Sequence, residues 1–235
     1  MMYGAIKAVD RLTDYALLLF FLLLVLIGGY TMYDTLLIYN ATSGADLRSF
    51  RPLAAEEEGF VWDMSALSED VVAWLTVDDT NIDYPVMQGI DNSEYLNKDP
   101  FGEYSLAGSI FLDARNAPDF SDPYSLIYGH HMEYGRMFGA LDEFLDEEYF
   151  EAHRTATLTV ADVTHNIDFF ACIEADASVH EIFAPTETTG TLEYVRAHAS
   201  VWREPKGEKL LALSTCKFPQ TTARIIVFGV FESNA

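Results

Sequence analysis

Cysteine and basic residues are scarce in this sequence. Only Cys172 and Cys216 occur among its 235 residues, and the absence of a Cys-x-x-Cys pair argues against a structural zinc site. A disulfide between them stays open if the domain is extracellular. Lys and Arg total 14 against 37 Asp and Glu, for a net charge of −23. Such a surface repels nucleic acid, so we expect no nucleic-acid partner, and we predict no metal and no other cofactor.

Charge is also missing from one long stretch near the N-terminus. Residues 15–33 are dominated by Leu and Phe, and at ~1.5 Å per residue a helix over them can cross a hydrocarbon core of ~30 Å. Lys7 and Arg11 precede the stretch and Asp34 follows it, which favours a cytoplasmic N-terminus. We predict an uncleaved, single-pass anchor in the cytoplasmic membrane, with a cleaved signal peptide as the alternative.

The anchor divides the chain into three predicted segments. Residues 1–40 form the cytoplasmic N-terminus and the transmembrane signal-anchor. Residues 41–71 form a linker with an N-terminal helical segment over residues 47–58. Residues 72–235 form one exported, extracellular domain.

This exported domain is predicted to be mainly β, because short β-rich runs alternate with turn residues. The eight candidate strands cover residues 73–77, 83–88, 108–113, 125–130, 155–160, 166–174, 209–215 and 224–231. Short helices are predicted at residues 93–97, 137–145 and 147–153. A longer helix at residues 186–202 would form an insertion between the sixth and seventh strands, and insertions of that kind often carry function.

Cys216 ends an apolar run, so its side chain can face a cleft at the rim of the sheet. A cysteine becomes a nucleophile when a base removes its proton, and catalysis also needs donors where the oxyanion develops. A free cysteine more often fills a core, and Cys172, within Phe-Phe-Ala-Cys-Ile, fits that interpretation. Cys216 fits it poorly because its strand stops there.

A histidine and an arginine add the remaining parts for covalent catalysis. His130 ends another apolar run, after Gly129, whose missing side chain lets a substrate backbone come close. His131 would point to the opposite face. Arg224 opens the last apolar run, where a guanidinium is costly unless it meets an anion. Each residue also has an ordinary structural explanation, but three such side chains at strand ends together indicate a catalytic site.

The residues around this set resemble the sortase family, class B in particular. Residues 212–216, Ala-Leu-Ser-Thr-Cys, resemble the family's Thr-Leu-x-Thr-Cys motif, with Ala in place of the first Thr. Residues 223–230 resemble its arginine-bearing last strand, and residues 128–130, Tyr-Gly-His, its histidine motif. The further matches that point to class B lie at residues 81–86, 91–96, 108–113 and 137–139.

The resemblance implies an eight-stranded sortase-type β-barrel with short helices and a helical insertion between strands 6 and 7, on the outer face of a Gram-positive membrane. It implies a cysteine transpeptidase. Such an enzyme cleaves a C-terminal sorting motif of a secreted protein after Thr and joins the Thr carbonyl to an amine of lipid II or peptidoglycan.

The resemblance also assigns roles by matching positions. Cys216 would be the nucleophile, His130 the general acid and base, and Arg224 the donor to the oxyanion or the substrate carbonyl. The expected substrate-binding residues are Ser214, Thr215, Asn92, Leu96 and Tyr128.

Three alternative functions stay open. A pilin-polymerising sortase would use a Lys amine as the acceptor, and a simple cysteine peptidase would use water. A membrane-tethered binding module would carry out no chemistry, and it would leave the placement of the cysteine, histidine and arginine without a reason.

Overall fold

The computed structural model describes residues 2–41, 47–52, 66–161, 163–186, 190–216 and 221–232. The chain divides into two compact units, Met1–Ala41 and Thr42–Ala235. The first unit holds one helix, α1 (Met2–Ala41). Within it, Asp10–Tyr33 is long enough, and at a mean hydropathy of 2.2 apolar enough, to cross a membrane. The side chains of that segment are exposed.

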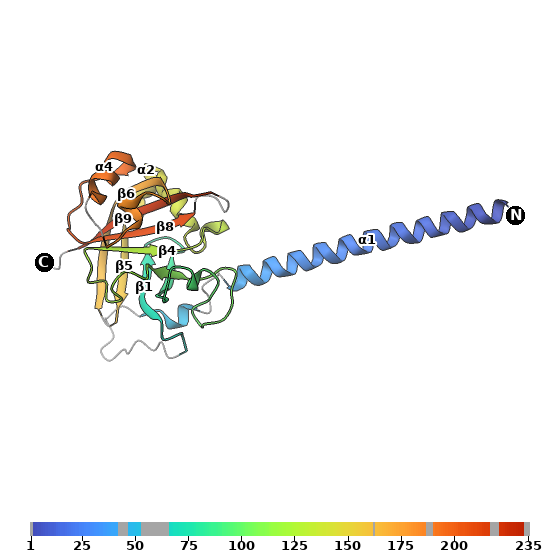
Figure 1. Cartoon of the computed structure of the whole chain (residues 1–235), viewed down its shortest axis with the longest axis horizontal. Helices are drawn as coiled ribbons and strands as arrows, with labels where there is room; N and C mark the ends of the chain where they lie inside the picture. Colours follow the sequence, from blue (N-terminus) through green and yellow to red (C-terminus); the bar gives the residue numbers. More distant parts are fainter. Residues whose placement is uncertain are drawn as a thin grey trace. The chain divides into compact units, whose positions relative to one another are not determined.

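The second unit is built on a closed β-barrel (Figure 1). Its strands are β1 (Val71–Val77), β2 (Asp83–Met87), β3 (Ile110–Leu112), β4 (Tyr124–Tyr128), β5 (Thr155–Val160), β6 (Val163–Asp176), β7 (Ala199–Trp202), β8 (Leu210–Cys216) and β9 (Ala223–Phe231). Their order is β5-β1-β2-β3-β4-β8-β9-β6-β7, and the pairing of β5 with β6 closes a ring of eight strands. The ninth strand, β7, lies outside the ring on β6.

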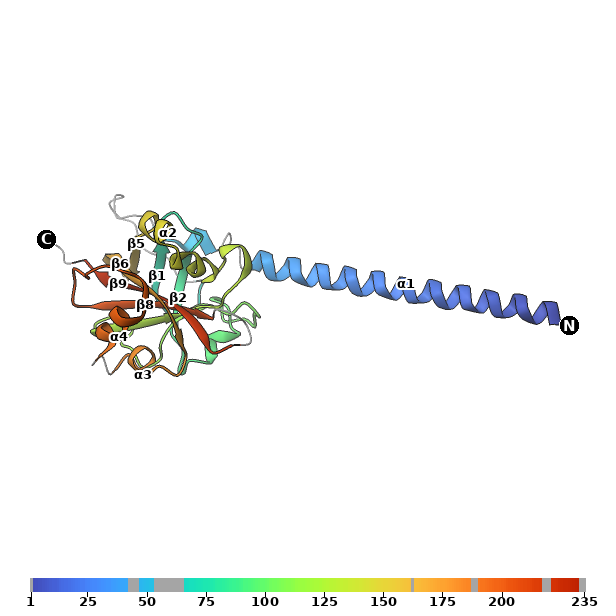
Figure 2. The same ribbon diagram turned by 90° about the horizontal axis from the view of Figure 1, so that it is seen from above.

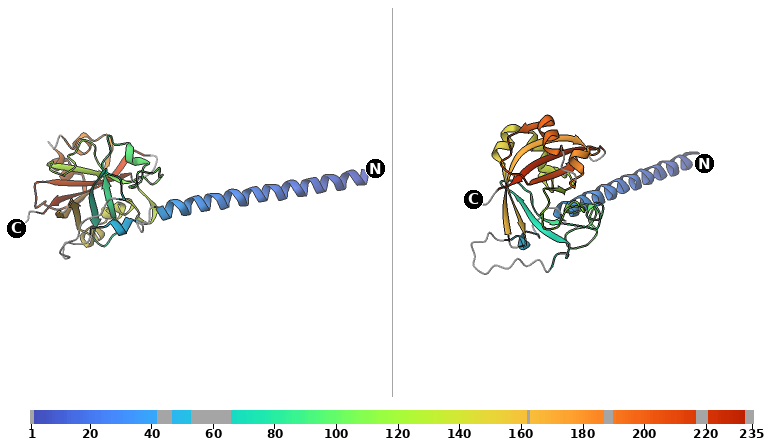
Figure 3. Two further views of the ribbon diagram at one scale, coloured as in Figure 1. Left: turned by 90° about the horizontal axis from the view of Figure 1, so that it is seen from below. Right: turned by 60° about the vertical axis from the view of Figure 1, so that its left-hand side comes forward.

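The predicted eight-stranded barrel is confirmed, and each predicted strand overlaps one strand of the ring. Two boundaries differ near the predicted histidine. β4 ends at Tyr128 rather than at His130, and β3 is only three residues long. The longest strand, β6, exchanges partners along its length, first with β5 and later with β7 (Figure 3, right).

The helices of this unit are short. They are η1 (Leu47–Phe50), η2 (Glu94–Leu96), η3 (Glu133–Gly135), η4 (Gly139–Leu145), α2 (Glu147–Ala152), α3 (His180–Phe183) and α4 (Thr191–His198). The η elements are 3₁₀-helices, so the predicted turns at residues 93–97 and 137–145 are tighter than α-helix. Of the predicted helix at residues 47–58 only the first turn is observed, and residues 53–65 lie outside the described part of the chain.

The predicted helix at residues 186–202 is wrong in its extent. The helical insertion between β6 and β8 contains α3 and α4, and α4 begins only after Gly190, whose φ is 88°. The last four predicted helical residues form β7 instead. Trp202 pairs with Ala171 and Val201 with Cys172, so strand formation satisfies backbone groups of β6 that a helix would leave unpaired.

The barrel wall buries apolar side chains on both faces. Along β8, Leu211 and Leu213 belong to the inner core cluster, whereas Leu210 and Ala212 belong to an outer cluster. The outer cluster is covered by α3 and α4, which lie on the opposite side of the strands from α2 (Figure 2). Sheet faces buried on both sides explain why the strands read as continuous apolar runs.

Cys172 lies in the inner cluster with no exposed surface and is a free thiol. Its predicted place in the core is confirmed, and the alternative of a disulfide with Cys216 is wrong. Burial raises the pKa of the Cys172 thiol well above its usual range, which keeps it neutral and inert.

Candidate active site

Three strand ends meet at one end of the barrel. β4 and β8 are parallel, Tyr128 pairs with Ser214, and the Gly129 N–H donates to the Ser214 carbonyl at 3.1 Å. His130 and Cys216 each come two residues after this pair. β9 runs antiparallel to β8, with Arg224 paired to Cys216. Because parallel strands end on the same side of a sheet, this topology gathers all three predicted catalytic positions.

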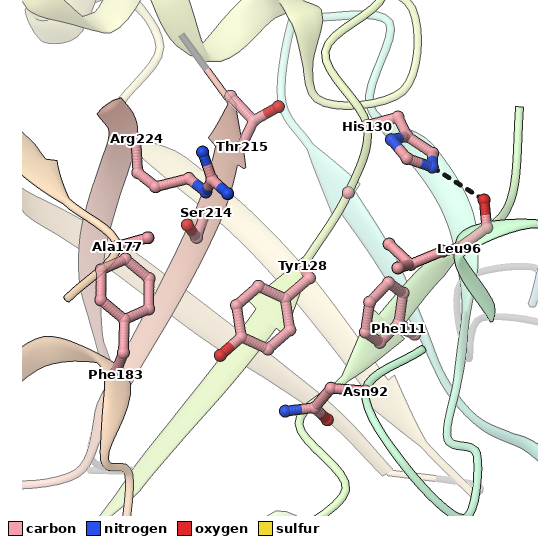
Figure 4. Close-up of a pocket in the computed structure, with 11 residues that line it drawn as sticks. Asn92, Leu96, Phe111, Tyr128, His130, Ala177, Phe183, Ser214, Thr215 and Arg224 are labelled. Carbon is pink, nitrogen blue, oxygen red and sulfur yellow. Dashed lines mark hydrogen bonds between the residues drawn. The ribbon is translucent and has the colours of Figure 1, made fainter. Parts of the chain in front are cut away.

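A pocket of about 310 Å³ opens at this end (Figure 4). Its described lining consists of Asn92, Leu96, Phe111, Tyr128, Gly129, His130, Ala177, Phe183, Ser214, Thr215 and Arg224. Every predicted site residue is in this lining except Cys216, for which the structure gives the position at the end of β8 and the register with β9. Phe111, Ala177 and Phe183 were not predicted.

His130 is oriented by a backbone carbonyl. Its Nε2 lies 2.8 Å from the Leu96 carbonyl oxygen, and since a carbonyl can only accept, Nε2 carries the hydrogen. The other ring nitrogen, Nδ1, is thereby the one that can take up a proton when the ring is neutral. Gly108, with φ of 60°, makes this arrangement possible, because a Cβ there would lie 2.6 Å from the Leu96 oxygen.

His131 has a different environment from its neighbour. Its Nε2 lies 2.7 Å from Asp142 Oδ2, and it does not line the pocket. The sequence pattern placed it on the opposite face, and this contact explains it as part of the support for η4, which contains Asp142.

Arg224 is held at the pocket by the chain before it. Its Nη1 donates to the Thr221 carbonyl at 3.0 Å and to the Ala223 carbonyl at 3.2 Å. In Figure 4 its guanidinium lies beside Ser214 and Thr215, across the pocket from His130 and Leu96. Hydrogen bonds from Ser178 and Thr222 lower the pKa of the nearby Asp176 to about 2, and the Arg224 charge adds to this effect.

Three buried hydroxyls lack partners among the described residues, and two of them belong to the pocket-lining residues Ser214 and Thr215. Both residues are 1% exposed, and their hydroxyl oxygens are buried. A buried hydroxyl without a partner costs about 1–3 kcal/mol. A molecule in the pocket does not reach these oxygens in the observed conformation, so the role of both residues in substrate binding stays a prediction.

Asn92 and Tyr128 also line the pocket, but their polar atoms are bound to protein. Asn92 Nδ2 and Tyr128 Oη each donate to Asp113 Oδ2 at 2.9 Å, and Asn92 Oδ1 accepts from the Ala114 N–H at 2.7 Å. These side chains therefore shape the pocket more than they offer free polar groups. Asp113 itself has no exposed surface and was not singled out from the sequence.

Comparisons with known proteins show which family has this architecture. Residues 75–232 match the sortase domain family. The chain is 35% identical over 161 residues to sortase B of Listeria monocytogenes, an alignment that covers 66% of this chain and 65% of that protein. It is also similar to two solved structures. One is a Streptococcus pyogenes class B sortase involved in pilus biogenesis, with 42% identity, a TM-score of 0.66, and 71% of this chain and 95% of that chain covered. The other is a Staphylococcus aureus sortase B–substrate complex, with 25% identity, a TM-score of 0.65, and coverage of 72% and 82%.

Proposed function

Since this chain belongs to the sortase family, in its class B, we propose that it is a cysteine transpeptidase that cleaves a sorting motif after Thr and transfers the Thr carbonyl to an amine. One observation carries the proposal. The ladder register sets Cys216 opposite Arg224, at the barrel end where His130 and Arg224 line one pocket. Positions 214 and 216 of β8 lie on the same face of the strand, because alternate residues share a face, and Ser214 lines that pocket.

The reaction would proceed in two halves. The Cys216 thiolate attacks the Thr carbonyl carbon, and Arg224 donates hydrogen bonds to the oxygen that becomes negative. His130, protonated, gives its proton to the leaving amine as the peptide bond breaks, leaving a thioester. The neutral His130 then removes a proton from the incoming amine, which attacks the thioester and releases the thiolate.

Turnover is expected to be slow. A free thiol has a pKa of about 8.5 and an imidazole one of about 6.5, so without strong coupling only a small fraction of molecules holds thiolate and imidazolium together near neutral pH. The Arg224 cation is the group in this site that favours the thiolate.

The pocket fits a peptide of mixed character. Phe111, Tyr128 and Phe183 supply apolar rings, while His130 and Arg224 supply polar groups. The Staphylococcus aureus structure is a complex of sortase B with a substrate, which supports substrate binding by this fold. We infer that the substrates are secreted proteins with a C-terminal sorting motif, and that the acceptor is an amine of lipid II or peptidoglycan.

The apolar helix α1 bears on the cellular location of the protein. We infer that it is a single-pass anchor with the catalytic domain outside the cell, because Asp10–Tyr33 can span a membrane and the substrates are exported. In that arrangement the pocket and its acceptor are on the same side of the membrane.

The proposal is tested with the full-length chain in detergent and quenched peptides that carry Leu-Pro-x-Thr or Asn-Pro-x-Thr. Products are identified by mass, with and without an oligoglycine or diaminopimelate-type amine. An amide product that disappears in Cys216→Ala and in His130→Ala is the expected result. Hydrolysis at a rate independent of amine would instead indicate a peptidase, and no cleavage with an unreactive thiol would indicate a binding module.

A second candidate function is the polymerisation of pilins with a Lys acceptor. The specific observation in its favour is the 42% identity to the Streptococcus pyogenes sortase involved in pilus biogenesis, higher than the 25% to the Staphylococcus aureus enzyme. A competition between a Lys-bearing peptide and a diaminopimelate-type amine separates the two. Wall anchoring predicts preference for the second amine, and pilus assembly predicts preference for the Lys side chain.

A further inference from the structure

Three parts of the pocket wall are connected through one buried carboxylate. Asp113 directly follows β3 and has no exposed surface. It accepts hydrogen bonds from Asn92 and Tyr128, both pocket residues, and from Arg115. The Arg115 contact is bidentate, with Nε 2.8 Å from Oδ1 and Nη2 2.6 Å from Oδ2. Such a fork fixes the plane of the guanidinium as well as its position.

Asp113 stays charged despite its burial. Desolvation by itself would raise its pKa, but the hydrogen bonds from Arg115, Asn92 and Tyr128 hold the pKa below its ordinary value. At neutral pH the ionised carboxylate therefore accepts hydrogen bonds from all its donors at the same time.

Arg115 carries this connection to the helical insertion. The same Nη2 that contacts Asp113 also donates to the Phe183 carbonyl at 2.8 Å. Phe183 is the last residue of α3, and its side chain lines the pocket facing the strands that carry Tyr128 and Ser214. Arg115 does not line the pocket itself.

The helix α3 keeps other attachments when this one is broken. The Tyr124 hydroxyl donates to the Ile182 carbonyl at 2.9 Å, and the Thr191 hydroxyl donates to the Glu181 carbonyl at 2.6 Å. Ile182 is fully buried in the outer core cluster. Loss of the Arg115 bond would thus leave α3 folded but its last residue less constrained.

We propose that Arg115 is a positioning residue that sets the width of the groove for the sorting motif. Its guanidinium bonds both the Phe183 carbonyl and Asp113, and Asp113 also accepts from Tyr128. These contacts hold Phe183 at a fixed separation from Tyr128. The inference rests on the proposed transpeptidase function. It assigns Arg115 to recognition of the peptide and not to acyl transfer, since neither His130 nor Arg224 contacts it within the described residues.

Steady-state kinetics of Arg115→Lys in the full-length chain test the proposal, with the same two quenched peptides as probes. Lysine keeps the charge beside Asp113 but cannot form the fork and reach Phe183 together. We expect KM to rise about three- to tenfold, as for the loss of one hydrogen bond, with kcat within about twofold of wild type. The preference between the two motifs should fall, and the rate of Cys216 alkylation by iodoacetamide should not change.

The matched control is Arg154→Lys. Arg154 forms a comparable pair with Asp168, with Nη2 2.9 Å from Oδ1, and neither residue lines the pocket. The KM of the Arg154→Lys variant should stay at the wild-type value even if the melting temperature of the variant falls. Arg115→Gln, which also loses the charge, should raise KM at least as much as Arg115→Lys.

The outcomes separate the two hypotheses. A wild-type chain that cleaves neither motif overturns the proposed function and this inference with it. A wild-type chain that cleaves a motif while Arg115→Lys keeps its KM overturns the inference alone. Equal rises in KM for Arg115→Lys and Arg154→Lys would also overturn it, because they would indicate general loosening of the fold.

Discussion

The two sides of the pocket are built in different ways. One side, the strand wall, consists of Phe111, Tyr128 and Ser214, from β3, β4 and β8, and each of these strands is paired along both edges. The other side, the insertion wall, consists of Ala177 and Phe183. It follows the end of β6, packs on the strands through the outer core cluster, and is tied to them at two α3 carbonyls by Arg115 and Tyr124.

The two walls suit two different requirements of the site, the stabilisation of charge and the recognition of a peptide. Stabilising a developing charge needs donors held in place before the reaction, and a closed ladder fixes positions better than a short helix does. Recognition of a peptide tolerates a wall that can adjust, and elements with few attachments open at lower free-energy cost. We therefore expect changes in the strand wall and its catalytic residues to act on kcat, and changes in the insertion wall to act on KM.

Apart from the loss of Cys216 or His130, Arg224→Ala should have the largest effect on the reaction. Removing a donor to an oxyanion typically lowers kcat by about 10²–10³-fold. Single-turnover measurements of thioester formation with a quenched peptide would detect it. Arg154→Ala, far from the pocket, should leave this rate unchanged. A rise in KM with unchanged kcat in Arg224→Ala would place Arg224 in recognition and contradict the proposed division.

Asp113→Asn should have the next largest effect, on stability as well as on both walls. The change replaces one carboxylate oxygen by an amide NH2, so the donors to that oxygen lose their acceptor, at a cost of about 1–3 kcal/mol at pH 7. The pKa of Asp113 is below its ordinary value, so its contribution is present above pH ~4 and is lost as the pH falls further. Denaturant unfolding of wild type and variant should show a gap that narrows towards pH 3. A gap independent of pH would refute a charged Asp113.

Phe183→Ala tests the insertion wall directly. Removing the ring takes away apolar contact surface, and we expect KM for the quenched peptide to rise about tenfold with little change in kcat. Leu192→Ala is the control, because Leu192 lies in α4 with an exposed side chain and does not line the pocket. A fall in kcat without a rise in KM would mean that Phe183 belongs with the catalytic groups.

His131→Gln should have the smallest effect. The partly exposed pair of His131 with Asp142 is worth less than about 1 kcal/mol, and His131 is outside the pocket lining. The variant should keep kcat and KM within about twofold of wild type. His130→Gln, one residue away, should abolish transfer. Similar losses in both variants would show that the segment as a whole, and not one imidazole, is required.

The apolar runs of the sequence predicted the eight strands, and the sortase resemblance implied that they close into a barrel. The residue that ends each run placed Cys216, His130 and Arg224 at strand ends, and their catalytic roles stay predictions. Asp113 also ends such a run, but its partners Asn92, Arg115 and Tyr128 meet it only in the folded chain. In a sequence, an Asp at the end of a strand cannot be distinguished from an ordinary turn residue. The role of Asp113 as a shared hydrogen-bond acceptor could therefore not be predicted.

Two other differences have the same origin. β7 is four residues long and follows a helix directly, so only its pairing with β6 distinguishes it from a last helical turn. Gly129 was expected to admit a substrate backbone. The structure gives a second reason, because a Cβ there would lie 2.5 Å from Ile110 Cδ1 and 2.7 Å from the Phe138 ring. Both features depend on contacts between segments distant in sequence.

The parallel pairing of β4 with β8 also bears on when the pocket is completed during folding. β4 ends at Tyr128 and β8 begins at Leu210, with three strands of the chain between them. Contacts of such long sequence separation form late, because loop closure must precede any reward from pairing. While the chain is emerging, its histidine has neither the cysteine nor the arginine beside it. The pocket that these residues share is therefore incomplete until the last strands, β8 and β9, have paired.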